Sequence, residues 1–121
     1  MAEIFIAENV PSSKNSKVWT GKYLVHSKTV RNYISKTKQD WIENKEKFEE
    51  LIKDKEVPYK IEFTFIRNSR RKFDYINPCQ TAQDLMVTYD YIEDDNCNCI
   101  IPSFGEYKYD KKDSGVKIKI L

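Results

Sequence analysis

Acidic side chains flank a short predicted helix in the middle of this 121-residue chain. Asp74 precedes the helix, Asp84 lies within it, and the adjacent pair Asp94 and Asp95 follows it. Adjacent carboxylates repel each other and are costly to bring together unless a cation neutralises them. Carboxylate oxygens are the ligands that Mg²⁺ prefers. We therefore expect the carboxylates on either side of the helix, Asp74 and Asp95 above all, to converge on a divalent metal ion; the alternative is that residues 93–96 form an exposed acidic turn.

A basic run lies directly before the first of these acids. Arg70, Arg71 and Lys72 precede Asp74, and Arg67 ends the predicted strand before them. Contacts from Lys and Arg to phosphate oxygens give affinity for nucleic acid without reading its bases. The net charge of +2 is too small to indicate nucleic-acid binding by itself. Cation-binding acids beside these bases nevertheless indicate metal-assisted chemistry on a nucleic acid, with a solvated charge run as the alternative.

The elements that must position these side chains follow from the apolar periodicity. Apolar residues recur at helical spacing over residues 28–53, which Ser27 can cap, and they alternate over residues 59–67. Further strands are expected at residues 3–9, 98–104 and 115–121, with a small hairpin around Gly21 and a polar, turn-like stretch at residues 105–114. Pro102 restricts its strand to an edge or a bulge. The order predicts an α+β fold: one small domain whose mixed β-sheet packs against one long and one short helix.

The short helix is expected to span residues 78–90. Asn77 is a favoured N-cap, and Pro78 suits the first helical position. Asn77, Gln80 and Asp84 are three and four residues apart and share one side of the helix. If that side faces a cleft, Asp84 joins the other acids; a capping box with a solvated Asp84 is the alternative. The opposite, core-facing side is expected to carry Ala82, Leu85, Met86 and Tyr89.

The remaining composition excludes other classes of site. The three cysteines (Cys79, Cys97 and Cys99) are an odd number, and the N-terminal residues lack a signal-peptide pattern, so we expect reduced thiols in a cytoplasmic protein. The close pair of cysteines lacks the spacing of most zinc ligands, and His26 is distant in sequence. No apolar run approaches the roughly 18 residues of a membrane span.

Several segments, taken in order over most of the chain, resemble RusA-type Holliday-junction resolvases, a family of small Mg²⁺-dependent endonucleases. Residues 10–17 are similar to the family's Pro-Ser-x-Asn loop, and residues 70–77 to its basic run that leads into Asp-x-Asp-Asn. Asp84 falls where the family's helix carries an Asp, and residues 93–96 resemble its acid pair. The chain departs from the family at two positions. Ile76 replaces a second catalytic Asp, and Gln80 replaces a catalytic Lys.

The resemblance implies hydrolysis of phosphodiester bonds at four-way DNA junctions by a homodimer. It implies Mg²⁺, or Mn²⁺, as the cofactor. The implied catalytic residues are Asp74, Asp95, Asn77 and Gln80. The implied metal ligands are Asp74, Asp95, Asp94 and Asp84. The implied DNA-binding residues are Lys14, Asn15, Arg67, Arg70, Arg71 and Lys72.

Three alternatives stay open beside this resemblance. Because Ile76 cannot bind a metal and Gln80 carries no charge, one alternative is a non-catalytic or weakly active junction-binding protein of the same fold. Another is a different structure-selective nuclease that uses the same metal site. The third is a small regulatory domain whose acidic loop is only a solvated turn.

Overall fold

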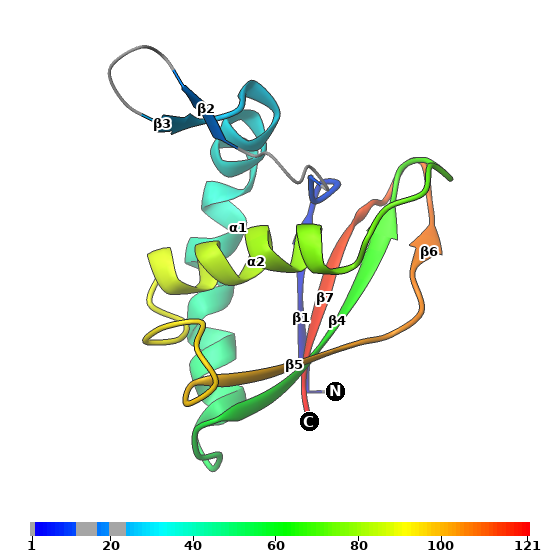
Figure 1. Cartoon of the computed structure of the whole chain (residues 1–121). Helices are drawn as coiled ribbons and strands as arrows, with labels where there is room; N and C mark the ends of the chain where they lie inside the picture. The colour runs from blue at the N-terminus through cyan, green and yellow to red at the C-terminus, as the bar shows by residue number, and fades with distance from the viewer. Residues whose placement is uncertain (1, 12–16, 20–23) are drawn as a thin grey trace.

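A mixed β-sheet forms one layer of the protein, and helices cover one of its faces (Figure 1). The computed structural model describes residues 2–11, 17–19 and 24–121. The sheet has the strand order β1-β7-β4-β5, with β6 also paired to β4. β4 runs parallel to β5 and β6 and antiparallel to β7. The sheet strands are β1 (Glu3–Ala7), β4 (Tyr59–Arg67), β5 (Ile100–Phe104), β6 (Lys108–Tyr109) and β7 (Gly115–Ile120).

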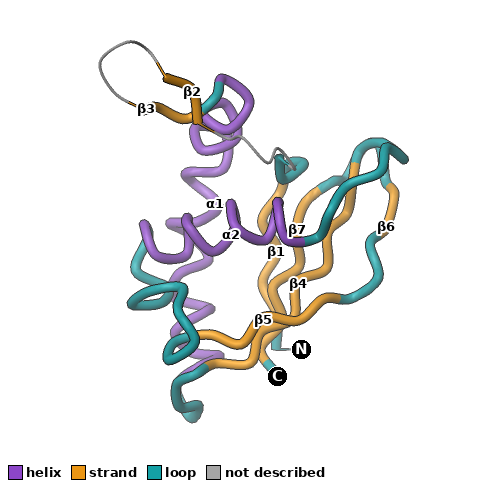
Figure 2. The backbone as a smooth tube through the Cα atoms, in the orientation of Figure 1, coloured by secondary structure: helices purple, strands orange, loops and turns teal. Residues whose placement is uncertain are grey.

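The covering layer and a small hairpin complete the described residues. α1 (Lys28–Ile52) lies along the sheet, and α2 (Ile76–Thr88) crosses beside it (Figure 2). β2 (Lys17–Trp19) and β3 (Leu24–His26) form a separate antiparallel pair before α1. The α+β class, the mixed sheet and the one long and one short helix predicted from the sequence are therefore confirmed.

Alternation along much of β1, β4 and β7 separates a buried face from a polar one. Ile4, Ile118 and Phe63 are paired across β1, β7 and β4, and all three side chains are buried beneath the helices. The adjacent pair along β4 and β7, Glu62 and Lys119, lies on the opposite face of the sheet. Because side chains alternate with a period of two, this register fixes which residues enter the core.

The long helix is held to the segment after α2 by aromatic packing. Ser27 caps α1, as predicted, by accepting a hydrogen bond from the Val30 backbone N–H at 3.4 Å. Trp41 is fully buried, stacks on Tyr89 at 6.2 Å between ring centroids and meets Tyr91 edge-on at 5.3 Å. The Tyr91 hydroxyl also donates to the Trp41 carbonyl. The turn that leaves α2 is thus anchored to α1.

Two local predictions are wrong. α2 begins at Ile76, so Asn77 lies in its first turn, and Tyr75 takes the N-cap position without a side-chain capping bond. The Asn77 N–H donates to the Asp74 carbonyl at 3.1 Å, which extends the first turn backwards. Pro78 tolerates this shift because first-turn N–H groups have no partner within a helix. The other error is β6, which forms in the stretch expected to be turn-like because it pairs with the end of β4.

Gly115 begins β7 where the neighbouring strand leaves no room for a side chain. A Cβ atom there would lie 2.5 Å from the Ile6 carbonyl oxygen and would also collide with the Phe5 ring. We expect Gly115→Ala to lower the free energy of unfolding by about 1–3 kcal/mol, measured by urea denaturation, because the backbone of β1 must move. The matched control Lys119→Ala, exposed on the same strand, should change it by less than about 0.5 kcal/mol. Equal effects of the two would contradict this packing.

Candidate functional site

The exposed side of α2 carries the centre of the candidate site. Ala82, Leu85 and Met86 bury the opposite side of the helix in the core, which leaves Gln80 and Asp84 exposed. The Gln80 Nε2 atom donates to Asp84 Oδ1 at 2.8 Å and to Asp95 Oδ2 at 3.2 Å. A single amide nitrogen therefore bridges two carboxylates that come from different segments of the chain.

A reversal of the chain after α2 brings Asp95 back to the helix. Asp90 has a positive φ of 60° at the helix end, where Asp is one of the residues that tolerate the left-handed region. The next two backbone N–H groups, of Tyr91 and Ile92, both donate to the Met86 carbonyl, at 2.7 and 3.4 Å. The side chains of Tyr91 and Ile92 are buried, so the following loop is fixed beside α2. Helix capping and core packing thus position Asp95.

The other two predicted metal ligands have different surroundings. Both carboxylate oxygens of Asp94 accept hydrogen bonds within its own turn, from the Asp95 N–H at 2.8 Å and the Asn96 Nδ2 at 3.1 Å. Asp74 is exposed immediately before α2. In the described part of the chain, no group of three or more His, Cys, Asp or Glu side chains could hold a metal ion as it stands. Of the four predicted ligands, Asp84 and Asp95 are the two that accept from one donor, whereas the convergence of Asp74 with Asp95 stays a prediction.

The donor chemistry of this pair fits a hard divalent cation. Asp84 is exposed and Asp95 is half-buried. One carboxylate oxygen of each lies within 3.2 Å of a single atom, Gln80 Nε2, so both could contact a single ion at that position. Mg²⁺ keeps several waters and needs only one or two carboxylates from a protein. The Gln80 amide that now donates to both carboxylates is neutral, whereas a cation in its place would also offset their negative charges.

The basic loop after β4 is held by aromatic side chains. The Arg67 guanidinium donates to the Val10 carbonyl and lies 4.5 Å from the centre of the Phe73 ring. Arg70 lies 4.3 Å from the centre of the Tyr109 ring. The first of these cation–π contacts joins the start of the loop to Phe73, and the second fastens the middle of the loop to β6.

The outcome differs among the six residues predicted to bind DNA. Arg67 is only 7% exposed, and burial lowers the pKa of its guanidinium, so it supports the loop and has little surface for a DNA phosphate. Arg70, Arg71 and Lys72 are exposed, as their predicted role requires. Lys14 and Asn15 lie outside the described residues.

The sequence did not reveal the aromatic support under the start of α2. Phe73 packs against Tyr75 and Tyr107 at 5.2 Å each between ring centroids, and Tyr75 packs against Phe104 at 5.3 Å. The Tyr75 hydroxyl accepts a hydrogen bond from the Tyr107 N–H at 3.0 Å. These residues come from two stretches of the chain, 73–75 and 104–107, so only their aromatic character was visible in the sequence.

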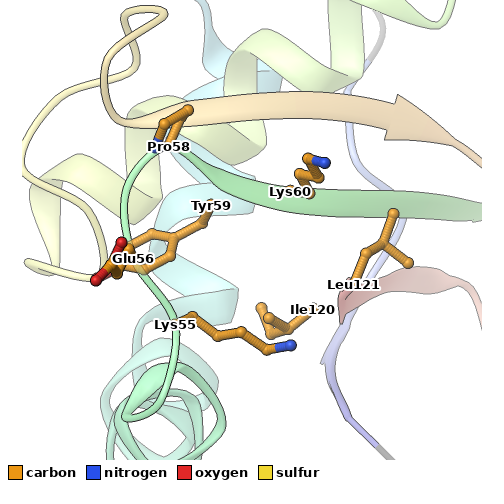
Figure 3. Close-up of a pocket in the computed structure, with 7 residues that line it drawn as sticks. All are labelled: Lys55, Glu56, Pro58, Tyr59, Lys60, Ile120 and Leu121. Carbon is orange, nitrogen blue, oxygen red and sulfur yellow. The ribbon is translucent and has the colours of Figure 1, made fainter.

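A hollow of about 170 Å³ lies at the beginning of β4, away from the basic loop that follows its end (Figure 3). Its wall includes Lys55, Glu56 and Lys60. Figure 3 shows Lys55 extending toward Ile120, whereas Glu56 points away from it. None of the predicted site residues lines this hollow, and its charged groups do not converge.

Comparison with known proteins adds no family assignment. No protein-family model matches the chain, and no curated protein matches it. Among the described residues, no helix is long and apolar enough to cross a membrane.

Proposed function

We propose that this protein is a metal-dependent endodeoxyribonuclease that hydrolyses phosphodiester bonds in branched DNA, with the four-way junction as its substrate. The main observation behind the proposal is that Asp84 and Asp95 both accept a hydrogen bond from the same nitrogen of Gln80. These three positions are also site positions in the resemblance to RusA-type resolvases. The fold class and the exposed bases of residues 70–72 support the same proposal.

Each site residue has a defined task in this proposal. Asp84 and Asp95 would hold Mg²⁺ or Mn²⁺, with Asp74 as the third carboxylate. A divalent ion held there would supply activation of water and stabilisation of charge on the phosphoryl oxygens. The Gln80 Nε2 group, which donates to both carboxylates, would be placed to donate to a phosphate oxygen of the substrate as well. Asn77, in the first turn of α2, lies where the helix dipole favours negative charge.

A symmetric pair of chains would match the substrate. A four-way junction has near two-fold symmetry, and its resolution needs two cuts on opposed strands. A homodimer with C2 symmetry would present two equivalent sites for these cuts. The homodimer is therefore part of the proposal.

A second candidate function is junction binding with little or no cleavage. It is favoured by Ile76, which is 72% exposed at the start of α2, where the resemblance places a catalytic Asp. An exposed apolar side chain there supplies neither a ligand nor a charge. A protein with these residues would retain phosphate contacts while losing catalytic power.

Purified protein, Mg²⁺ and synthetic DNA distinguish the two functions. We expect paired, symmetric nicks in a four-way junction, no cutting of a linear duplex of equal length, and no cutting when EDTA is added. Tight junction binding without nicks would favour the second candidate. Equal affinity for junction and duplex would contradict both.

Gln80→Lys is expected to increase the cleavage rate by about 10-fold or more, because a positive charge beside the reacting phosphate stabilises the transition state. Position 80 is exposed, so the variant should fold normally. The matched control is Gln39→Lys, which makes the same exchange at an exposed position of α1 that takes no part in the site. Single-turnover rates on the junction provide the measurement. No gain, or an equal gain in the control, would contradict the role given to position 80.

Ile76→Asp is expected to increase activity for a related reason. The new carboxylate would stand at the exposed start of α2, where the helix dipole stabilises negative charge. Its effect should appear as a lower Mg²⁺ concentration at half-maximal rate. An unchanged Mg²⁺ dependence would show that position 76 does not face the metal.

A further inference from the structure

A polar hollow of about 460 Å³ lies where the end of β1, the start of α1 and the loop after β4 meet. Arg67, Arg71 and Lys72 supply three bases to its wall. Ser27 and Thr29 line it from the beginning of α1. Among the described residues that line this hollow there is no acid. We call it the basic pocket.

The walls of the basic pocket are fixed by hydrogen bonds between its segments. The Asn68 N–H donates to Asn9 Oδ1 at 2.9 Å, and the Arg67 guanidinium donates to the Val10 carbonyl. These two bonds join the end of β1 to the end of β4. The Arg71 N–H donates to Ser69 Oγ at 3.4 Å, which shapes the loop beyond them. The bases are therefore presented on a supported surface.

The start of α1 adds a favourable field for an anion. The 25-residue helix has no acidic residue in its first turn, so nothing on the helix itself neutralises the partial positive charge there. Ser27 Oγ accepts from the Val30 N–H, which leaves the N–H groups of Lys28 and Thr29 in the first turn, and N–H groups at such positions are common ligands of phosphate. In this structure they stand beside two exposed bases, Arg71 and Lys72.

An adjoining hollow of about 280 Å³ has in its wall a residue whose buried hydroxyl lacks a partner among the described residues. The two hollows share part of their walls, including Asn9, Thr29 and Asn68. Tyr33 lines the second hollow and is 4% exposed, and its hydroxyl has no hydrogen-bond partner among the described residues. Burial, with smaller contributions from Asp40 and Glu8, raises the pKa of Tyr33 far above its usual value, so the hydroxyl keeps its proton. A ligand oxygen that reached this hydroxyl would satisfy a donor that has no partner among the described residues.

We propose that the basic pocket binds a phosphate group, with the rest of a nucleotide extending toward the Tyr33 hydroxyl. Charge-assisted hydrogen bonds from Arg71 and Lys72 would supply the affinity. The claim that the pocket binds DNA rests on the proposed function. The claim that it binds inorganic phosphate does not depend on that function. None of the residues that line it is Gln80, Asp84 or Asp95, so binding here is measured without cleavage.

The test is an NMR titration of the ¹⁵N-labelled full chain without divalent metal. Inorganic phosphate is expected to shift the amide signals of residues 27–30 and 69–72. The double variant Arg71→Gln and Lys72→Gln should have an affinity for phosphate that is lower by a factor of about 10 or more. The matched control Arg31→Gln and Lys47→Gln removes the same two charges from exposed positions on α1 outside both hollows, and should bind as the unaltered chain does.

Two further arms identify the source of the phosphate and the role of Tyr33. If a short DNA duplex shifts the same signals, the source is the DNA backbone; if only phosphate or a deoxynucleoside monophosphate does, the source is a free phosphate ester. Tyr33→Phe should weaken binding of the monophosphate and leave that of inorganic phosphate unchanged. Unshifted pocket amides, or equal binding by the double variant and its control, would overturn the proposal. That outcome would leave the proposed nuclease function intact if cleavage still depends on Asp95. In the same way, an absence of cleavage would not contradict phosphate binding in the basic pocket.

Discussion

Asp95→Asn is expected to reduce the rate of Mg²⁺-dependent junction cleavage by more than about 100-fold, beyond the range typical of residues that only support metal ligands. The substitution keeps the shape of the side chain but removes half of the carboxylate pair that meets on Gln80. Single-turnover cleavage of a labelled four-way junction at saturating protein measures the loss. Junction binding should be unchanged or tighter, because a negative charge near phosphate has been removed.

Asp54→Asn is the matched control, since Asp54 is exposed in the turn after α1 and takes no part in the site. It should cleave at the normal rate. Asp74→Asn is expected to behave as Asp95→Asn does, with cleavage lost and binding kept. Near-normal turnover by either site variant would show that the metal is held elsewhere.

Trp41→Ala is expected to lower the free energy of unfolding by about 3–5 kcal/mol, as large-to-small substitutions of buried aromatics do. Trp41 is fully buried in the core between α1 and the segment after α2, and its ring contacts both Tyr89 and Tyr91. Its loss leaves a cavity at the anchor of the loop that carries Asp95. Urea denaturation followed by circular dichroism measures the change.

Ile42→Ala provides the comparison, because Ile42 is the next residue of α1 and is 48% exposed. This variant should differ from the unaltered chain by less than about 0.5 kcal/mol. A loss of stability in Trp41→Ala no greater than that in Ile42→Ala would contradict the described core.

The elements were predictable wherever one face of an element is buried. The helical stripe through Trp41, Phe48 and their neighbours and the alternation along β4 were visible in the sequence, and both elements formed as predicted. Pro102 was expected at an edge or a bulge, and β5 is an edge strand. The start of α2 was missed because Asn77 and Pro78 form a strong local capping signal. The backbone instead continues the turn that begins at Asp74.

The site was predictable as a set of residues but not as a set of contacts. Spacing on the helix put Gln80 and Asp84 on one side, and the structure confirms that both are exposed. That Asp95 returns to Gln80 depends on the reversal at Asp90, which carries no strong sequence signal. Arg67 appeared as one member of a basic run, and only the fold shows that its side chain is buried beside Val10. The basic pocket was invisible for the same reason, since three distant segments build it.

Paramagnetic broadening by Mn²⁺ tests the central claim most directly, namely that the paired carboxylates of Asp84 and Asp95 bind a divalent cation. On addition of Mn²⁺ to the ¹⁵N-labelled chain, the amide signals around Gln80, Asp84 and Asp95 should broaden first. Excess Mg²⁺ should restore them, and Asp95→Asn should abolish the effect. Broadening centred elsewhere, or equal broadening in the Asp95→Asn variant, would contradict the metal site and the nuclease proposed from it.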